Sequence, residues 1–463
     1  MSSAGSPVSK LYRAIWRWHF YAGLVVAPFL LILAVTGSIY LFNDEINDWL
    51  HPQYRFVQNQ GPAMPVSHWI AAALEKHPGA VTRVDLPATP DRPGVVFITP
   101  DKGEPVRVVV EPATMAVLGS YIYAQTLVGF ADEMHGSLTI GTLGDRIVEL
   151  AACWALVLLV TGIYLWWPRG AAFHAGGVFF PRLRLKGRAL LKDIHVVTGV
   201  WTVLLIAFLI LTGLPWAGVQ GDVLKRVTAA AGIGYPASNR GYGAPQSVPM
   251  KTALKEAPWT LEDAPMPQSQ PMAQVANEHA GHPGHDIAVA GHDPAAVAGV
   301  DRITDVLWAR GLTGGYRLFL PAGPTGIYTA YTYPDQPQGQ RTLYFDRYSS
   351  KLIKDVSYAD YGWGAKAIEL GVQLHMGNYF GRANQILMLV PCLGIVLLVI
   401  SGIWMWWKRK PGGKLAAPPK VPGARLQIAI GVMVVAGAVL PLFGASLIAV
   451  FALDRVAAAL KRA

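Results

Sequence analysis

Residues His19–Phe42 read HFYAGLVVAPFLLILAVTGSIYLF and contain no charged side chain. A helix of about 20 apolar residues crosses the ~30 Å hydrocarbon core of a bilayer, so this stretch is long enough to span a membrane. Four further stretches of the same character follow, at Leu150–Trp167, Val196–Trp216, Ile386–Trp407 and Ile428–Leu453. The sequence therefore predicts an integral membrane protein with about five spanning helices in contact with lipid.

The composition of the chain supports this assignment. The 463 residues are 52% hydrophobic and 15% charged, whereas soluble domains carry about 25% charged residues. The apolar run of the first stretch is longer than the core of a secretory signal, so we expect it to remain as an uncleaved anchor. Cys153 and Cys392 both fall inside predicted spans, where we expect small core residues rather than a disulfide.

Positive charge is concentrated in three short segments next to the predicted spans. Lysine and arginine in short loops on one side are typical of the cytoplasmic face. This bias orients the N-terminus toward the cytoplasm, and it explains the net charge of +10 without a nucleic-acid partner. The residues are Lys10, Arg13 and Arg17; Arg169, Arg182, Arg184, Lys186, Arg188 and Lys192; and Lys408, Arg409, Lys410, Lys414, Lys420 and Arg425.

The orientation divides the chain into membrane and external parts. Residues 1–42 form the anchor helix, 146–216 the second and third spans with a basic loop, and 384–463 the last two spans. Residues 43–145 and 217–383 are external, and each is predicted to hold a small α+β module. The expected elements are a helix at Trp69–Leu74 with strands at Val95–Ile98 and Val106–Val110, then a helix at Ile303–Leu307 with strands at Tyr316–Leu320, Ile327–Tyr333 and Thr342–Phe345.

An insertion interrupts the second external segment. Residues 236–298 are rich in Pro, Gly, Ala and polar residues and show little periodicity, which is typical of a poorly ordered loop. Clustered histidines can hold a transition metal, although a flexible polar loop with incidental affinity explains the same pattern. The histidines of this cluster are His279, His282, His285 and His292.

The membrane part contains an internal repeat. His19-x3-Gly23 opens the first span and His195-x3-Gly199 the third, and twelve residues separate each glycine from a Thr-Gly pair. His135 precedes the second span and His375 the fourth, each with a glycine 27 positions later and a Trp-Trp pair beyond it. A two-helix unit is therefore used twice. The later members are Thr36-Gly37, Thr212-Gly213, Gly162, Gly402, Trp166-Trp167 and Trp406-Trp407.

Each repeat contributes one histidine near each side of the membrane. In a bundle, His19 can face His195 near the cytoplasm, and His135 can face His375 near the outside. Ionisable residues at membrane depth are expensive and normally functional. Neutral imidazole is a standard axial ligand of haem iron, and helix bundles build cofactor sites from facing helices. The four histidines are thus predicted to form two ligand pairs.

Small and aromatic residues fit the same interpretation. Gly23 and Gly199 lie one turn from their histidines on the same helix face, where a larger side chain would collide with a flat macrocycle; close helix packing is the alternative reason for glycine there. The tryptophan pairs stand at the predicted cytoplasmic boundary, where aromatic residues anchor membrane helices.

These residues resemble the PepSY-associated transmembrane family, whose members are often described as iron-regulated membrane proteins. The similarity covers roughly residues 10–235 and 300–410. Two external stretches, Val109–Met115 and Tyr344–Ser350, resemble the closing strand and turn of PepSY modules, which usually read Asp-x-x-Thr-Gly. The motifs are Arg17-Trp18-His19-x3-Gly23, Thr36-Gly37, Asp193-Ile194-His195, Leu374-His375 and the Gly-x3-Trp-Trp span ends, with departures at Glu111, Met115 and Ser350.

The resemblance implies a function. The family includes ferric-siderophore reductases of the bacterial inner membrane, which carry haem b and reduce iron in the periplasm. By that similarity His19, His135, His195 and His375 are haem ligands, two haem b groups are bound, and the acceptor is a ferric siderophore or another Fe(III) chelate. The electron donor is a quinol or another protein, because no nucleotide-binding fingerprint is present.

Two other functions remain open from the sequence. The histidines could bind and move iron or copper directly, or the external modules could regulate an envelope partner. The absence of charged residues inside the predicted spans weakens an ion-coupled transporter. No hydrolytic triad is recognisable, and no catalytic side chain is predicted.

Overall fold

The protein is described here by a computed structural model, which covers residues 10–59, 61–169, 175–235, 249–269, 293–409 and 427–460. The chain forms two compact units. Unit 1 comprises residues 1–41, 131–226 and 374–463, and unit 2 comprises residues 42–130 and 227–373.

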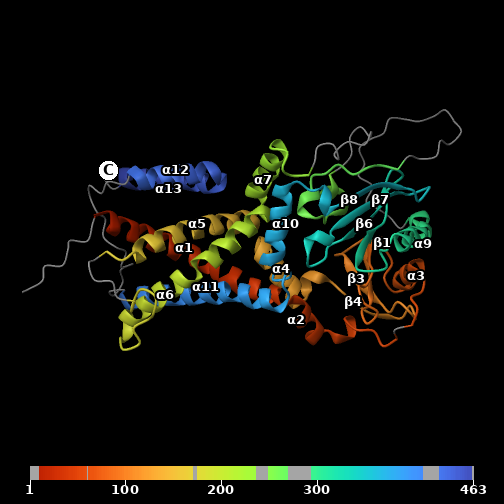
Figure 1. Ribbon diagram of the computed structural model, residues 1–463, viewed down its shortest axis with the longest axis horizontal. Helices are drawn as coiled ribbons and strands as arrows, with labels where there is room; N and C mark the ends of the chain where they lie inside the picture. Colours follow the sequence, from red (N-terminus) through yellow and green to blue (C-terminus); the bar gives the residue numbers. More distant parts are fainter. Residues whose placement is uncertain are drawn as a thin grey trace, which may run out of the picture. The chain divides into compact units, whose positions relative to one another are not determined.

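Unit 1 is built on a bundle of four long apolar helices. They are α1 (Lys10–Leu41), α5 (Thr142–Trp166), α6 (Gly187–Gly213) and α11 (Arg382–Arg409), and within the described residues they are the helices long and apolar enough to cross a membrane. Helix α1 packs against α5 and α11, and α6 packs against the same two helices (Figure 1). The four spans predicted from the repeat are confirmed.

The expected fifth span is not one helix. The chain from Gln427 to Leu460 forms α12 (Gln427–Val439) and α13 (Pro441–Leu460), both too short in their apolar parts to count as spans. A Cβ on Gly437 would meet the Cα of Gly444 at 2.9 Å, so the two helices fold back on each other. Pro441 lacks the amide hydrogen that would continue α12, and the charge-free pattern of this region could not reveal that break.

Short helices connect the long ones. Helix α4 (Leu127–Ser137) precedes α5 and α10 (Trp363–His375) precedes α11. Both junctions turn through left-handed residues, at Gly141 with φ 63° and at Gly377 with φ 80°. The remaining short helices are α2 (Asn43–Leu50), η1 (Pro52–Tyr54), η2 (Tyr123–Gln125), η3 (Leu214–Trp216), α7 (Gly218–Ala230), α8 (Met250–Leu254), η5 (Trp259–Leu261), η6 (Pro337–Gly339) and η7 (Tyr358–Asp360).

Unit 2 contains one antiparallel sheet in the order β4-β3-β2-β1-β5-β6-β7-β8. The two predicted α+β modules are therefore halves of a continuous sheet, joined where β1 pairs with β5. The predicted helices and strands are present, and β1, β4 and β8 are additional. The halves are α3 (Val66–Lys76), β1 (Ala80–Asp85), β2 (Gly94–Thr99), β3 (Val106–Val110) and β4 (Val117–Tyr121); and α9 (Pro294–Ala309), β5 (Tyr316–Phe319), β6 (Ile327–Thr332), β7 (Arg341–Asp346) and β8 (Leu352–Ser357).

Helices α3 and α9 cover one face of the sheet (Figure 1). Trp69 and Ile70 from α3, and Ile303 and Leu307 from α9, pack there in a single buried core with alternate strand residues such as Val84. The second face is covered over β5–β8 by a different cluster, which includes Met250, Leu261 and Phe319.

Two turns of the sheet place a residue other than glycine in a left-handed conformation. Met115 and Ser350 have φ of 63° and 55°, in the left-handed region where glycine is expected. Glu111 accepts hydrogen bonds from the amides of Gln58 and Asn59 and from the hydroxyl of Thr114. Asp346 similarly accepts from the amide and hydroxyl of Ser349. Glutamate in place of aspartate thus keeps a carboxylate at the turn.

Candidate histidine pairs in the helical bundle

The four repeated histidines lie in unit 1 in two pairs. His19 on α1 and His195 on α6 are close enough to repel each other electrostatically when charged, and the same holds for His135 on α4 and His375 on α10. Thr36 on α1 contacts His135, and Thr212 on α6 contacts His375. Thr36 lies 17 positions after His19, and Thr212 lies 17 positions after His195, which corresponds to about 26 Å along a helix. The two pairs therefore lie near opposite ends of the bundle.

Each histidine bonds a hydroxyl on a neighbouring helix through its Nδ1. The distance is 2.8 Å from His19 to the Oγ1 of Thr161, and 3.0 Å from His195 to the Oγ of Ser401. At the other end of the bundle, the Nδ1 atoms of His135 and His375 lie 3.1 Å and 2.9 Å from the Oγ1 atoms of Thr36 and Thr212. The four contacts are equivalent under the sequence repeat.

The hydroxyls fix which imidazole nitrogen carries the hydrogen. A hydroxyl has one hydrogen to donate, and each of these four gives it to the carbonyl four residues earlier in its own helix, at 2.6 to 2.8 Å. The hydroxyl oxygen must then accept from Nδ1–H. A neutral imidazole protonated at Nδ1 keeps the lone pair of Nε2 available for a metal.

Each ring is held from its Nδ1 edge. Among the residues that the structure describes, the hydrogen bonds from the four histidines to side chains all use Nδ1, and the backbone of Leu33, Leu398 and Leu209 also bonds His135, His195 and His375. All four side chains are half-buried rather than enclosed. The neighbouring helices therefore fix the orientation of each ring.

A glycine directly after each hydroxyl residue makes room for the ring. A Cβ placed on Gly37 would lie 3.1 Å from the Cε1 of His135, and a Cβ on Gly213 would lie 3.4 Å from that of His375. The corresponding distance is 3.5 Å from Gly162 to His19 and from Gly402 to His195. Only the Gly37 distance is shorter than an ordinary van der Waals contact, so a side chain there would require the His135 ring to move.

These glycines are not the two selected from the sequence. Gly23 and Gly199 face leucines of the neighbouring helices, with hypothetical Cβ atoms 3.8 Å from Leu158 and 3.6 Å from Leu398. Those distances are ordinary packing contacts. The Thr-Gly pairs were visible as part of the repeat, but only the structure shows which histidine each pair touches.

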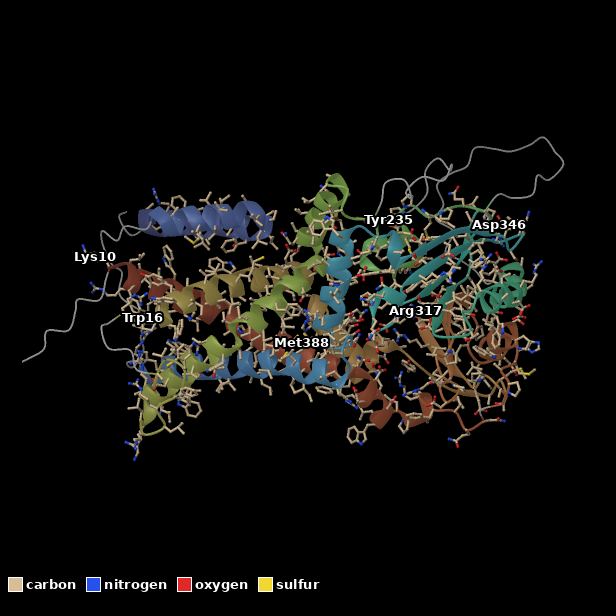
Figure 2. All side chains as sticks on the ribbon, in the orientation of Figure 1. Lys10, Trp16, Tyr235, Arg317, Asp346 and Met388 are labelled. Atoms are coloured by element: carbon tan, nitrogen blue, oxygen red, sulfur yellow. The ribbon has the colours of Figure 1, made fainter. Side chains whose placement is uncertain are left out.

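Basic and aromatic side chains gather at the end of the bundle that carries His19 and His195. Arg409 of α11 stacks over Trp16 and Phe20 of α1, and Arg169 stacks over Tyr12. Figure 2 shows Lys10 and Trp16 at this end. Trp167 is 62% exposed and Trp407 is 68% exposed, as expected of side chains that anchor helices at a membrane surface.

The remaining predicted residues give a mixed result. Cys153 and Cys392 are both buried free cysteines. His279, His282, His285 and His292 lie outside the described residues. Within the described ranges there is no group of three or more His, Cys, Asp or Glu that could hold a metal ion by themselves.

Sequence reasoning missed the ion pair of a buried aspartate with a partly exposed arginine. Asp193, two residues before His195, accepts hydrogen bonds from the Nε, Nη2 and backbone amide of Arg182. This contact attaches the loop before α6 to the helix that carries His195. The motif Asp193-Ile194-His195 signalled that the aspartate belongs to the repeat unit but not what it binds.

A model of the PepSY-associated transmembrane region matches residues 16–409. The chain belongs to this family. The match includes all four histidines, their hydroxyl partners and most of the four long helices, and it ends at the last residue of α11. Helices α12 and α13 therefore lie beyond it. No curated protein matches this PepSY-associated chain.

Proposed function

We propose that the protein binds two haem b groups, one by His19 and His195 and one by His135 and His375, and passes electrons across the membrane to an Fe(III) chelate. The observation that supports this proposal is the equivalent hydrogen bonding of four imidazoles, which lie in two pairs close enough to interact electrostatically. Each is held through Nδ1 and keeps Nε2 for iron.

The residues suit haem better than a bare metal ion. Two neutral imidazoles per site match the donor set of a low-spin b-type haem. A bare transition ion usually takes four or more protein or water ligands, and two imidazoles do not supply them. The glycines beside the rings and the apolar helices around them leave a site suited to a flat, largely apolar macrocycle.

The side chains of the protein would have defined tasks. The hydroxyls of Thr161, Ser401, Thr36 and Thr212 orient the rings and maintain the Nδ1–H tautomer. Haem b at the two sites would supply one-electron couples near the two membrane faces, so that each electron delivered converts one Fe(III) to Fe(II). The surrounding protein tunes the potentials through hydrogen bonding and burial.

The direction of transfer follows from the basic end of the bundle. We place the His19–His195 end in the cytoplasm of a bacterial inner membrane and unit 2 in the periplasm, because lysine and arginine gather at the His19–His195 end. The donor would be a quinol or a reduced protein, and the acceptor a ferric siderophore or another Fe(III) chelate. Fe(II) binds such chelators weakly, so reduction would release the metal.

The test is haem content and spectrum. Protein purified from haem-supplied cells should give two haem b per chain in a pyridine haemochrome assay, with a bis-imidazole spectrum that changes on reduction by dithionite. His19→Ala or His195→Ala should remove one haem, and His135→Ala or His375→Ala the other.

A folded, colourless preparation would end the proposal. Stoichiometric metal uptake without a chromophore would instead favour direct metal handling by the histidines. Absence of both would favour a regulatory role for the PepSY-like halves of unit 2.

A further inference from the structure

Cationic and aromatic side chains alternate along a row on the second face of the sheet in unit 2. Arg107 on β3 lies opposite Phe97 on β2, Phe97 lies opposite Arg83 on β1, and Arg83 lies opposite Phe319 on β5. Their strand neighbours, including Val84, belong to the core under α3 and α9. Because side chains alternate between faces, the row lies on the face away from those helices.

The cations of the row lie over aromatic rings. The guanidinium of Arg83 is 3.6 Å from the centre of the Phe97 ring and 5.4 Å from that of Phe319. The guanidinium of Arg107 is 3.9 Å from the centre of the Tyr123 ring and 5.0 Å from that of Phe97. Arg107 and Phe97 are half-buried, whereas Arg83 is buried.

The charges of this cluster do not balance. Arg83 pairs with Asp85 and Glu256, and Arg317, labelled in Figure 2, also pairs with Glu256. Arg107 acts on Glu256 only at a distance. In the described part of the chain its guanidinium has no ion pair or hydrogen bond and contacts rings alone. The cluster thus contains three guanidinium groups but only the two carboxylates of Asp85 and Glu256.

A guanidinium that lies near two rings and lacks an ion pair in the described part of the chain is suited to an anionic aromatic ligand. Its five donors match phenolate or carboxylate oxygens, and its flat face stacks on rings. Partial burial strengthens both attractions because water screens them less. A neutral ligand without rings would use neither property.

We propose that Arg107, Phe97 and Tyr123 form a recognition site for an anionic chelate with aromatic donors, such as a catecholate or phenolate complex of Fe(III). The identity of the metal rests on the proposed function, whereas the charge and ring preference rest on the cluster itself. Catecholate oxygens around Fe(III) leave a net negative charge and expose ring faces. Hydroxamate complexes have no aromatic donors and lack that charge.

The experiment is equilibrium dialysis of the full-length protein in detergent against the Fe(III) complex of dihydroxybenzoate. Arg107→Gln should weaken binding about tenfold or more, which is the expected loss for a charged hydrogen bond. Arg107→Lys keeps the charge without the planar fork and should bind with intermediate affinity.

The matched control is Arg341→Gln. Arg341 pairs with Asp355, and its register with Thr332 and Tyr316 places it on the opposite face of the sheet. The Arg341→Gln substitution removes the same net charge from unit 2 as Arg107→Gln, and it should leave binding unchanged. Equal weakening by both substitutions would overturn the site, as would unchanged binding in a folded Arg107→Gln protein or equal affinity for a trihydroxamate complex.

Binding and haem content are separate readouts. A colourless protein that still bound the catecholate complex through Arg107 would end the reductase proposal and retain this site. A two-haem protein with no preference for the catecholate complex would end the proposal of this site and retain the reductase proposal.

Discussion

Ser401 accepts a hydrogen bond from the Nδ1 of His195 at 3.0 Å and donates its own hydrogen to the carbonyl of Leu397 at 2.6 Å. The same three-part chain, from imidazole to hydroxyl to helix carbonyl, occurs at the other three histidines with threonine in place of serine. A hydroxyl at a helix surface commonly bonds its own backbone. Its repeated use to hold an imidazole is what distinguishes these sites from ordinary packing.

Removing one hydroxyl should weaken one site. Thr161→Val keeps the shape of the side chain but leaves the Nδ1 of His19 without its acceptor, so haem affinity at the His19–His195 site should fall about 10- to 100-fold. Haem titration of the apoprotein measures this, and the midpoint potential of that haem should also shift. Thr202→Val is the control, because within the described ranges the hydroxyl of Thr202 bonds the carbonyl of Thr198 and no imidazole. An equal effect there would mean that the hydroxyl acts through folding.

A methyl group beside the tightest imidazole should displace it. In Gly37→Ala the new Cβ would lie 3.1 Å from the Cε1 of His135, so we expect the His135–His375 haem to be lost or bound at least about 10-fold more weakly. Gly23→Ala adds the same methyl at 3.8 Å from Leu158 and should leave both haems in place. Two haems with unaltered spectra in Gly37→Ala would contradict the assigned geometry.

Replacing Ser350 by glycine should stabilise unit 2. Ser350 has φ 55°, and its buried hydroxyl has no hydrogen-bond partner among the described residues. Ser350→Gly should therefore raise the free energy of unfolding by about 1 kcal/mol, seen as a higher melting temperature. Ser350→Ala removes the hydroxyl but keeps the strained backbone, so it should gain less.

The stability that Glu111 contributes to the turn after β3 should depend on pH. Hydrogen bonds from Thr114 and from the amides of Asn59 and Gln58 hold the pKa of Glu111 below its usual range. The stabilisation is therefore present above the pKa of the unfolded chain and is lost as pH falls through the lower pKa of the folded state. Thermal melts of Glu111→Gln should show the largest deficit near neutral pH and convergence with the unsubstituted protein in acid. A constant deficit would contradict this assignment.

Parts of this architecture were predictable because their signals are local. Long charge-free runs gave α1, α5, α6 and α11, and equal spacings gave the four histidines. The pairing of β1 with β5 was not predictable, since nothing in the alternation of Ala80–Asp85 states which distant strand it will meet. The contact between Gly37 and His135 joins residues far apart in the chain, so spacing showed the glycine but not its neighbour.

Each hydroxyl bonds a histidine of its own repeat. Thr161 on α5 serves His19 and Thr36 on α1 serves His135, while Ser401 on α11 and Thr212 on α6 serve His195 and His375. Each duplicated half thus orients its own two imidazoles, and each histidine pair takes one member from each half. A homodimer of a single half, related by twofold symmetry, would contain the same pair of sites. The two copies differ at one of these hydroxyls, which is threonine at position 161 and serine at position 401.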